Sequence, residues 1–405
     1  MTCRSWKTVR LGDHCTKIGS GATPRGGESV YQDSGVSFIR SQNVYNSQFT
    51  LDGLAHLNDK HADLLKGVTV ETGDVLLNIT GDSVARSCRV PDEILPARVN
   101  QHVAIIRPKP EEFDSRFVGY FFISPFMQDT MLSLAGSGGT RKALTKEMIE
   151  RFEVPKPPRP VQERIASILS AYDDLIENNR RRMALLEDAA RQLYREWFIR
   201  LRFPSHEHTC ITEGMPEGWK RKALGDLCIE IRETLSPELL APDTPYIGLE
   251  HMPRRSIALT EWGRAEQVTS SKHRFREGEI LFGKIRPYFH KVGVAFIDGV
   301  ASSDAIVIRP IDLKVHGLVL MTVSSDPFVA VTAQTMREGS KMPRADWKHM
   351  QEYNVLVPPD GLLSNFESAI QAIVAQLKTL TFANQKLRAA LDLLLPRLMN
   401  GAISV

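Results

Sequence analysis

The sequence lacks the features that mark membrane-spanning, secreted and disulfide-stabilised proteins. None of its apolar runs approaches the roughly 20 residues that a transmembrane helix needs, and the N-terminal stretch contains no apolar core of a signal peptide. Its five cysteines are an odd number without a Cys-x-x-Cys pair, which favours reduced thiols over a disulfide framework. These absences predict a cytoplasmic protein that makes no contact with a membrane.

Sequence signatures of DNA-modifying catalysis are absent as well. The methyltransferase motif Asp/Asn-Pro-Pro-Tyr/Phe does not occur, because the Pro-Pro pairs at 157–158 and 358–359 follow Lys and Val. The acidic pair at 92–93 lacks the spaced lysine of a nuclease site. We therefore expect no catalytic residue in this chain and expect catalysis to be supplied by partner proteins.

Two segments match nucleotide or metal sites only in part. Residues 278–284 fit the start of a phosphate-binding loop, but Ile285 stands where Ser or Thr is needed for magnesium. Residues 206–210 contain two histidines and a cysteine without a fourth ligand at normal spacing. We interpret the first segment as a strand and turn and the second as a linker loop, and expect no cofactor or metal in this chain.

What the sequence does have is the composition of an ordinary folded protein, 42% hydrophobic and 24% charged. Its 405 residues are enough for two or three domains with hydrophobic cores. The net charge of +3 is too small to indicate a nucleic-acid partner by itself. Basic residues therefore carry that information only where they cluster.

The second half of the chain repeats the first with a slowly changing offset. Residues 71–77, ETGDVLL, match 276–282, REGEILF, at an offset of 205. Further matches in the same order join Trp6 to Trp219, 11–13 to 224–226, 107–108 to 309–310, 125–126 to 327–328 and 154–155 to 357–358. Ordered matches of this kind indicate one scaffold used twice, with different loops between its elements.

A long helix with a heptad seam is predicted at 161–199 and again at 370–398. Apolar residues recur every 3.5 residues on average, which is the spacing of a coiled coil, and each seam carries one asparagine at the same step. Because an exposed apolar seam is unstable in water, we expect the two helices to pair antiparallel with their asparagines face to face. The residues expected to make this pairing are Asn179, Asn384, Leu186 and Leu391.

Together, the repeat and the helices predict an α+β fold. Two mixed α/β domains are separated by two long helices that form an antiparallel coiled coil, with an internal pseudo-two-fold repeat. One helix is expected at 114–134 of the first domain. The expected boundaries are 1–157 and 202–359 for the domains, 158–201 for the first long helix, and 360–405 for the second with the C-terminal tail.

Short motifs in this order resemble the specificity subunit of a type I restriction-modification system over nearly the whole chain. The residues that carry the resemblance are 21–24, 73–76, 157–158, 162–166, 173–176, 196–198, 393–399 and Gly401. The resemblance implies two target-recognition domains, each reading one half of a split double-stranded DNA site. It also implies that the helices space these domains and dock two methyltransferase subunits, which bring in restriction and translocase subunits. S-adenosylmethionine, ATP and magnesium would then belong to the partner subunits.

Basic and amide side chains gather in segments predicted as loops, where they have the chemistry for reading DNA. Arg bridges two acceptors of guanine, Asn or Gln bridges adenine, and Lys or Ser holds phosphate. For any single residue, a solvated surface position explains the sequence equally well. The candidates are Thr23, Arg25, Arg40, Gln42, Asn43, Asn78, Thr80, Arg86, Gln101, Arg141, Lys142, Arg254, Arg255, Lys272, Arg274, Lys284, Arg286, Tyr288, His290, Lys291, Lys341 and Arg344.

The first long helix offers candidates for partner docking. Arg180 and Arg181 lie on its predicted outer face, where ion pairs with solvated carboxylates are the alternative. Trp197 and Phe198, near its end, suit either an interface anchor or a core position. For the whole chain, a coiled-coil adaptor that binds only proteins and a self-contained DNA-modifying enzyme remain alternatives.

Overall fold

The computed structural model describes residues 6–136, 142–334 and 344–405, and the chain divides into two compact units. Unit 1 comprises Met1–Glu177 and Gln385–Val405, and unit 2 comprises Asn178–Asn384. Each unit therefore contains one mixed α/β domain, half of the first long helix and half of the second. The predicted helices thus belong to the units themselves, because each half packs on a domain.

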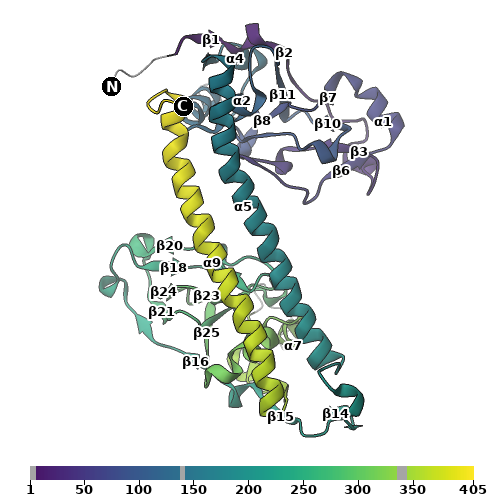
Figure 1. The fold of residues 1–405 in the computed structure, drawn as a ribbon, viewed down its shortest axis with the longest axis vertical. Helices are drawn as coiled ribbons and strands as arrows, with labels where there is room; N and C mark the ends of the chain where they lie inside the picture. The colour runs from purple at the N-terminus through teal and green to yellow at the C-terminus, as the bar shows by residue number, and fades with distance from the viewer. Residues whose placement is uncertain (1–5, 137–141, 335–343) are drawn as a thin grey trace. The chain divides into compact units, whose positions relative to one another are not determined.

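Both predicted long helices are present, and each begins before the first residue of its heptad seam, at Arg159 and Asp360. Helix α5 runs over Arg159–Tyr194 and continues as a π-helical turn at Arg195–Ile199, while α9 runs over Asp360–Met399. Pro160 sits in the first turn of α5, where a missing backbone N–H removes no helical hydrogen bond. Within each unit the segments of α5 and α9 lie side by side and run in opposite directions (Figure 1), as the seams predict.

The asparagines of the two seams meet inside unit 2. Asn179 Nδ2 donates a hydrogen bond to Asn384 Oδ1 at 2.9 Å, and Asn179 is buried. Toward the end of α5, Leu186 packs against the hydrophobic core of unit 2. In unit 1, Leu391 is buried on α9. A polar pair on an otherwise apolar seam favours one register of the two helices over its neighbours.

Unit 1 contains two four-stranded sheets and two short two-stranded ladders. The strand orders are β2-β11-β8-β9, β6-β3-β10-β7, β1-β12 and β4-β5. The strands are β1 (Thr8–Arg10), β2 (Cys15–Ser20), β3 (Val36–Ile39), β4 (Val44–Tyr45), β5 (Gln48–Phe49), β6 (Ala55–Leu57), β7 (Thr69–Val70), β8 (Val75–Asn78), β9 (Ser87–Arg89), β10 (Ala97–Val99), β11 (Val103–Pro108) and β12 (Glu153–Pro155). Strands β8 and β11, which are rich in apolar residues, form the centre of the first sheet.

The helix predicted at 114–134 is two helices. Helix α2 covers Ser115–Ile123 and α3 covers Pro125–Gly136. Ser124 between them is extended, with ψ at 144°, because a proline disfavours helical backbone in the residue before it. The remaining helices of this unit are short, α1 at Asp59–Leu64 and α4 at Lys146–Glu150.

Unit 2 contains two five-stranded sheets built on the same plan. The strand orders are β16-β25-β22-β23-β19, β17-β21-β24-β18-β20, β15-β26 and β13-β14. The strands are β13 (Ile211–Thr212), β14 (Met215–Pro216), β15 (Lys220–Ala223), β16 (Cys228–Ile231), β17 (Thr234–Leu235), β18 (Pro245–Ile247), β19 (Ala258–Leu259), β20 (Gly263–Arg264), β21 (Lys272–Phe275), β22 (Ile280–Gly283), β23 (Val292–Ala295), β24 (Gly299–Ala301), β25 (Ala305–Pro310) and β26 (Asn354–Val357). Its short helices are α6 (His316–Val323), α7 (Asp326–Gln334) and α8 (Trp347–Met350).

The repeat extends to the pairing of individual residues. In unit 1, Leu76 of β8 lies opposite Cys88 of β9, and in unit 2 Leu281 of β22 lies opposite Gly293 of β23. Each residue number in unit 2 is 205 higher than that of its counterpart in unit 1. Two hairpins with the same register and the same loop length therefore stand at equivalent places. Residues 278–284, which fit the start of a phosphate-binding loop, are the end of a turn at 277–278 followed by strand β22, in agreement with the predicted strand and turn.

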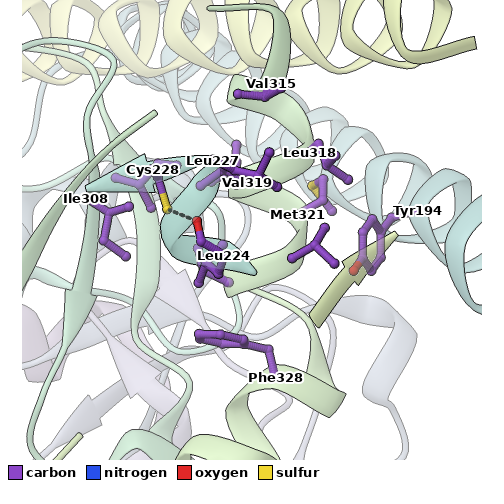
Figure 2. Packing of buried hydrophobic residues seen from close by; sticks show 14 of the residues in the cluster. Tyr194, Leu224, Leu227, Cys228, Ile308, Val315, Leu318, Val319, Met321 and Phe328 are labelled. Atoms are coloured by element: carbon purple, nitrogen blue, oxygen red, sulfur yellow. Dashed lines mark hydrogen bonds between the residues drawn. The ribbon is translucent and has the colours of Figure 1, made fainter. Parts of the chain in front are cut away.

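The core of unit 2 joins α6 to the first sheet and to the end of α5. Figure 2 shows Val315, Leu318, Val319 and Met321 pointing into this core, with Tyr194 of α5 at its edge. Every residue of α6 is buried, which explains its uniformly apolar sequence. Among the described residues no single helix is long and apolar enough to cross a membrane, although the bent pair Leu313–Val323 and Asp326–Gln334 passes jointly by length and composition.

Equivalent side chains tie each long helix to its domain. Gln162 of α5 is fully buried, and its Oε1 accepts from the backbone N–H of Asp114 at 2.9 Å. Glu367 of α9, 205 residues later, accepts from the N–H groups of Gly317 and Leu318, both at 2.7 Å. Burial raises the pKa of Glu367. Both contacts satisfy backbone donors near the start of a domain helix, which carbonyls of that helix cannot reach.

Candidate nucleic-acid interface

Two amides predicted to read bases in unit 1 are structural. Asn43 is fully buried and donates to the carbonyls of Thr50 and Asp52 at 3.0 and 3.3 Å. Asn78 is fully buried and donates to the carbonyls of Ser41 and Val44 at 2.8 and 3.3 Å. The prediction was wrong for both, because these side chains satisfy backbone groups that the irregular loops leave unpaired.

Two basic side chains of unit 2 are likewise turned inward. Lys272 is buried and donates to the carbonyl and hydroxyl of Ser270 at 3.0 and 2.7 Å. His290 is buried, and its Nε2 lies 2.6 Å from the carbonyl of Ser324, so this nitrogen carries the proton. Burial lowers the pKa of His290, which favours the neutral ring. Neither side chain reaches a ligand at the surface, so the prediction of DNA contact was wrong for both.

The two aromatic residues proposed for docking belong to the core of unit 2. Trp197 and Phe198 are buried, and their rings lie 5.7 and 4.8 Å from the ring of Phe366 on α9. They attach the end of α5 to the domain and cannot also anchor a partner. Arg180 and Arg181 are exposed on α5, so docking at that face stays a prediction.

Several predicted cations hold the protein's own acceptors. Arg40 donates to the Gly53 carbonyl at 2.6 Å, and burial lowers the pKa of Lys284 and of Lys291. Lys284 donates to the carbonyl of Ser303 and Lys291 to that of Leu249. The arginines paired with a carboxylate are Arg40 with Glu28, Arg255 with Asp326, Arg274 with Glu233 and Arg344 with Asp304. To contact a DNA phosphate, each of these residues would have to give up a hydrogen bond or an ion pair within the protein.

The other candidates are partly or fully exposed. In unit 1 these are Thr23, Arg25, Gln42, Thr80, Arg86, Gln101 and Lys142, and in unit 2 they are Arg254, Arg286 and Tyr288. Within unit 1, the Thr80 hydroxyl lies 2.6 Å from His102 Nδ1, and Gln101 Nε2 lies 3.2 Å from His102 Nε2. Arg141 and Lys341 lie outside the residues that the structure describes.

The turn between β22 and β23 presents the most concentrated group of exposed side chains among these candidates. Arg254 and Arg286 place their guanidinium carbons 4.2 and 5.8 Å from the ring centre of Phe289. Tyr288 is 53% exposed and meets the same ring edge-on at 5.0 Å. In the described part of the chain, neither guanidinium has a carboxylate partner. Stacking on an aromatic ring restricts a guanidinium without using its hydrogen-bond donors.

A polar network beneath this turn holds it to α5. The Arg255 N–H donates to the carbonyl of His290 at 2.9 Å, and Arg255 Nη1 donates to Asp326 at 2.8 Å. Arg191 of α5 contacts the Arg255 carbonyl and donates to Glu187 at 2.9 Å. Next to this network lies a cavity of about 300 Å³ that Tyr194 and Met321 help to line.

Glu187, a buried residue of α5, completes this network. Its Oε1 accepts from the backbone N–H groups of Ile257 and Ala258 at 3.1 and 3.2 Å and from the hydroxyl of Ser256 at 2.5 Å. The turn that carries Arg286 therefore has a fixed position relative to α5 within unit 2.

Sequence reasoning missed the aromatic supports. Phe289 under the arginines of unit 2, and Tyr45 under Arg86 of unit 1 at 4.7 Å, were not among the candidates. Phe289 lies inside the basic tract and was visible as an aromatic between cations. Tyr45 is 41 residues away from Arg86 in the sequence, and no local pattern joins the two.

Comparisons with known proteins agree with this architecture. Residues 4–188 match the family model of the type I restriction modification DNA specificity domain. The chain is 21% identical to the type I restriction enzyme MjaIX specificity subunit of Methanocaldococcus jannaschii, over 99% of this chain and 94% of that protein. It is 19% identical to the HindI specificity subunit of Haemophilus influenzae, over 98% and 99% of the two chains.

A solved structure shares the fold. The S subunit of a type I restriction-modification system from M. genitalium aligns over 98% of this chain and 97% of its own, with a TM-score of 0.63 at 14% identity. Residues 4–188 therefore match the DNA specificity domain of this family, and over nearly its whole length the chain is similar to specificity subunits of type I restriction enzymes.

Proposed function

We propose that this chain gives a type I restriction-modification complex its DNA specificity by reading a two-part site, one part with each unit. One observation carries the proposal. The two units keep the same sheet order and hairpin register, whereas the side chains in equivalent exposed turns differ. One framework with two different surfaces suits a protein that recognises two different short sequences in the same manner.

We also propose that the chemistry belongs to partner subunits. Methyltransferase subunits would dock on the two halves of the repeat and would bring in the restriction and translocase subunits. S-adenosylmethionine, ATP and magnesium would be bound by those partners. The role of this chain is then to bind double-stranded DNA and to place the partners on it.

Methylation mapping tests this proposal. The chain would be produced with a candidate partner methyltransferase, in cells without other DNA methylation, and the modified bases would be located by sequencing. The expected result is one motif of two short specific parts joined by an unspecified spacer, lost when this chain is omitted. An uninterrupted motif, or the same motif without this chain, would refute the proposal.

A further inference from the structure

The structure assigns base reading in each unit to one turn, the turn between β22 and β23 in unit 2 and its equivalent between β8 and β9 in unit 1. This inference rests on the proposed DNA-binding function and names the residues that carry it. In unit 2 we propose that Arg286, supported by Phe289 and flanked by Arg254, recognises a guanine in the major groove.

The two turns have the same backbone. Gly81 and Ala85 of unit 1 have φ angles of 74° and 73°, and Arg286 and His290 of unit 2 have φ angles of 50° and 54°. Each number increases by 205 between the units. At the base of the turn, the N–H of Asn78 bonds the carbonyl of Arg86, at 2.8 Å, and the equivalent bond from Gly283 to Lys291 is 2.9 Å. The framework is therefore constant.

Three residues between the left-handed positions differ completely. Unit 1 has Asp82, Ser83 and Val84, and unit 2 has Pro287, Tyr288 and Phe289. Val84 is buried, whereas its equivalent Phe289 is partly exposed, and Tyr288, at the position of the partly exposed Ser83, is 53% exposed. Identical turns with unrelated side chains are what two half-sites of different sequence require.

The turn of unit 2 and the neighbouring Arg255 contain residues with a left-handed backbone. Arg255, Arg286 and His290 all have positive φ, which costs energy for any residue with a Cβ, and Arg255 and His290 are hydrogen-bonded to each other. Gly81 stands where Arg286 stands, so the scaffold accepts a glycine there. Strain of this kind persists where the side chain that it presents has a function.

The charges identify the ligand. Arg254 and Arg286 both lie near the ring of Phe289, and in the described residues neither is paired with a carboxylate, so a ligand rich in acceptors relieves their repulsion. Guanine offers O6 and N7 side by side in the major groove, which a guanidinium bridges with two bonds. A contact with phosphate alone would not need a guanidinium held on an aromatic ring at the tip of a turn.

The test uses the complex of this chain with its methyltransferase and a panel of DNA duplexes carrying the mapped motif. Each base pair of the two half-sites is changed in turn, and binding by the wild type is compared with binding by Arg286→Ala and Arg286→Gly. The expected result is a loss of roughly 5- to 150-fold in affinity for the intact motif. Discrimination should disappear at one G·C pair of one half-site, while the other half-site is read as before.

The glycine variant separates reading from folding. Because glycine adopts positive φ without strain, Arg286→Gly should unfold at or above the wild-type temperature and still lose discrimination. Arg232→Ala is the control, because Arg232 is an exposed arginine of the same unit that is paired with Glu230 at 2.6 Å and is not among the candidates for DNA contact. It should leave discrimination at every position unchanged.

Two results would overturn the assignment. Uniform weakening at all positions would show that Arg286 holds phosphate, and unchanged discrimination would show that it does not contact DNA. Either result leaves the proposed function standing if the wild type still reads a two-part motif. If the wild type itself binds the motif no better than unrelated DNA, the proposed function fails and not only the assignment.

Discussion

Units 1 and 2 differ most where their backbones are most alike. The hairpins β8–β9 and β22–β23 share their register and their turn, yet one presents small and acidic residues and the other presents aromatic residues beside two arginines. The contacts that hold domain to helix follow the opposite pattern, since Gln162 and Glu367 do one task with related side chains. The comparison teaches that the framework is conserved by its internal bonds and that the exposed turn residues are free to change.

We expect the largest difference in stability at two equivalent ion pairs, Asp74 with Arg107 in unit 1 and Glu279 with Arg309 in unit 2. Asp74 is fully buried and receives two bonds from Arg107, at 2.7 and 2.8 Å, whereas Glu279 contacts Arg309 through one oxygen. We expect Asp74→Asn to lower the free energy of unfolding by about 3–5 kcal/mol, because it removes the fully buried charge that balances Arg107, whose remaining carboxylate partner, Glu71, is 57% exposed. Glu279→Gln should cost clearly less, since the Arg309 side chain is more exposed than that of Arg107. Calorimetric unfolding measures both, and equal losses would contradict the difference in geometry.

Exchanging the equivalent residues Gln162 and Glu367 should have the next largest effect. Gln162 also donates to the carbonyls of Glu112 and Pro157 at 3.1 and 2.9 Å, so a carboxylate there would face two acceptors. We expect Gln162→Glu to cost about 3 kcal/mol. Glu367→Gln should cost about 1–2 kcal/mol, because one of two backbone donors loses its acceptor. If Gln162→Glu and Glu367→Gln lower the free energy of unfolding equally, the different hydrogen-bond partners of the two side chains do not affect stability.

The same pair predicts a pH dependence. Burial raises the pKa of Glu367, so the folded protein binds this proton more tightly than the unfolded chain does. The stability contributed by the group is complete below its unfolded pKa and is lost as pH rises through the folded pKa. Glutamine does not titrate, so the deficit of Glu367→Gln should shrink as pH rises from 4 to 8. Denaturant unfolding across this range measures it, and a deficit that grows with pH would reverse the assigned sign.

The asparagine pair should have the smallest effect on stability. Replacing both Asn179 and Asn384 by leucine should raise the free energy of unfolding by about 1 kcal/mol, because an apolar seam is more stable than a polar one. Asn179→Leu alone should lower it by a similar amount, because Asn384 loses the bond at 2.9 Å. Denaturant unfolding compares the three proteins. A double variant less stable than the single one would show that the pair stabilises the helices directly.

The sequence predicted the features that depend on long or repeated patterns. The heptad spacing located both helices, and the matched offset brought Asn179 to Asn384, because periodicity over many residues leaves few alternatives. The break at Ser124 could have been predicted, since Pro125 marks it. The burial of Asn43, Asn78 and His290 could not have been predicted. The sequence does not show whether a polar loop residue faces water or bonds to a backbone carbonyl.

Substituting one arginine in each of the two equivalent turns tests the central claim most directly. Methylation motifs would be mapped for the wild type, for Arg86→Ala, which removes the guanidinium stacked on Tyr45 in unit 1, and for Arg286→Ala in unit 2. We predict that each variant relaxes specificity in a different half of the motif and leaves the other half and the spacer unchanged. Relaxation of both halves by either variant would contradict the assignment of one half-site to each unit.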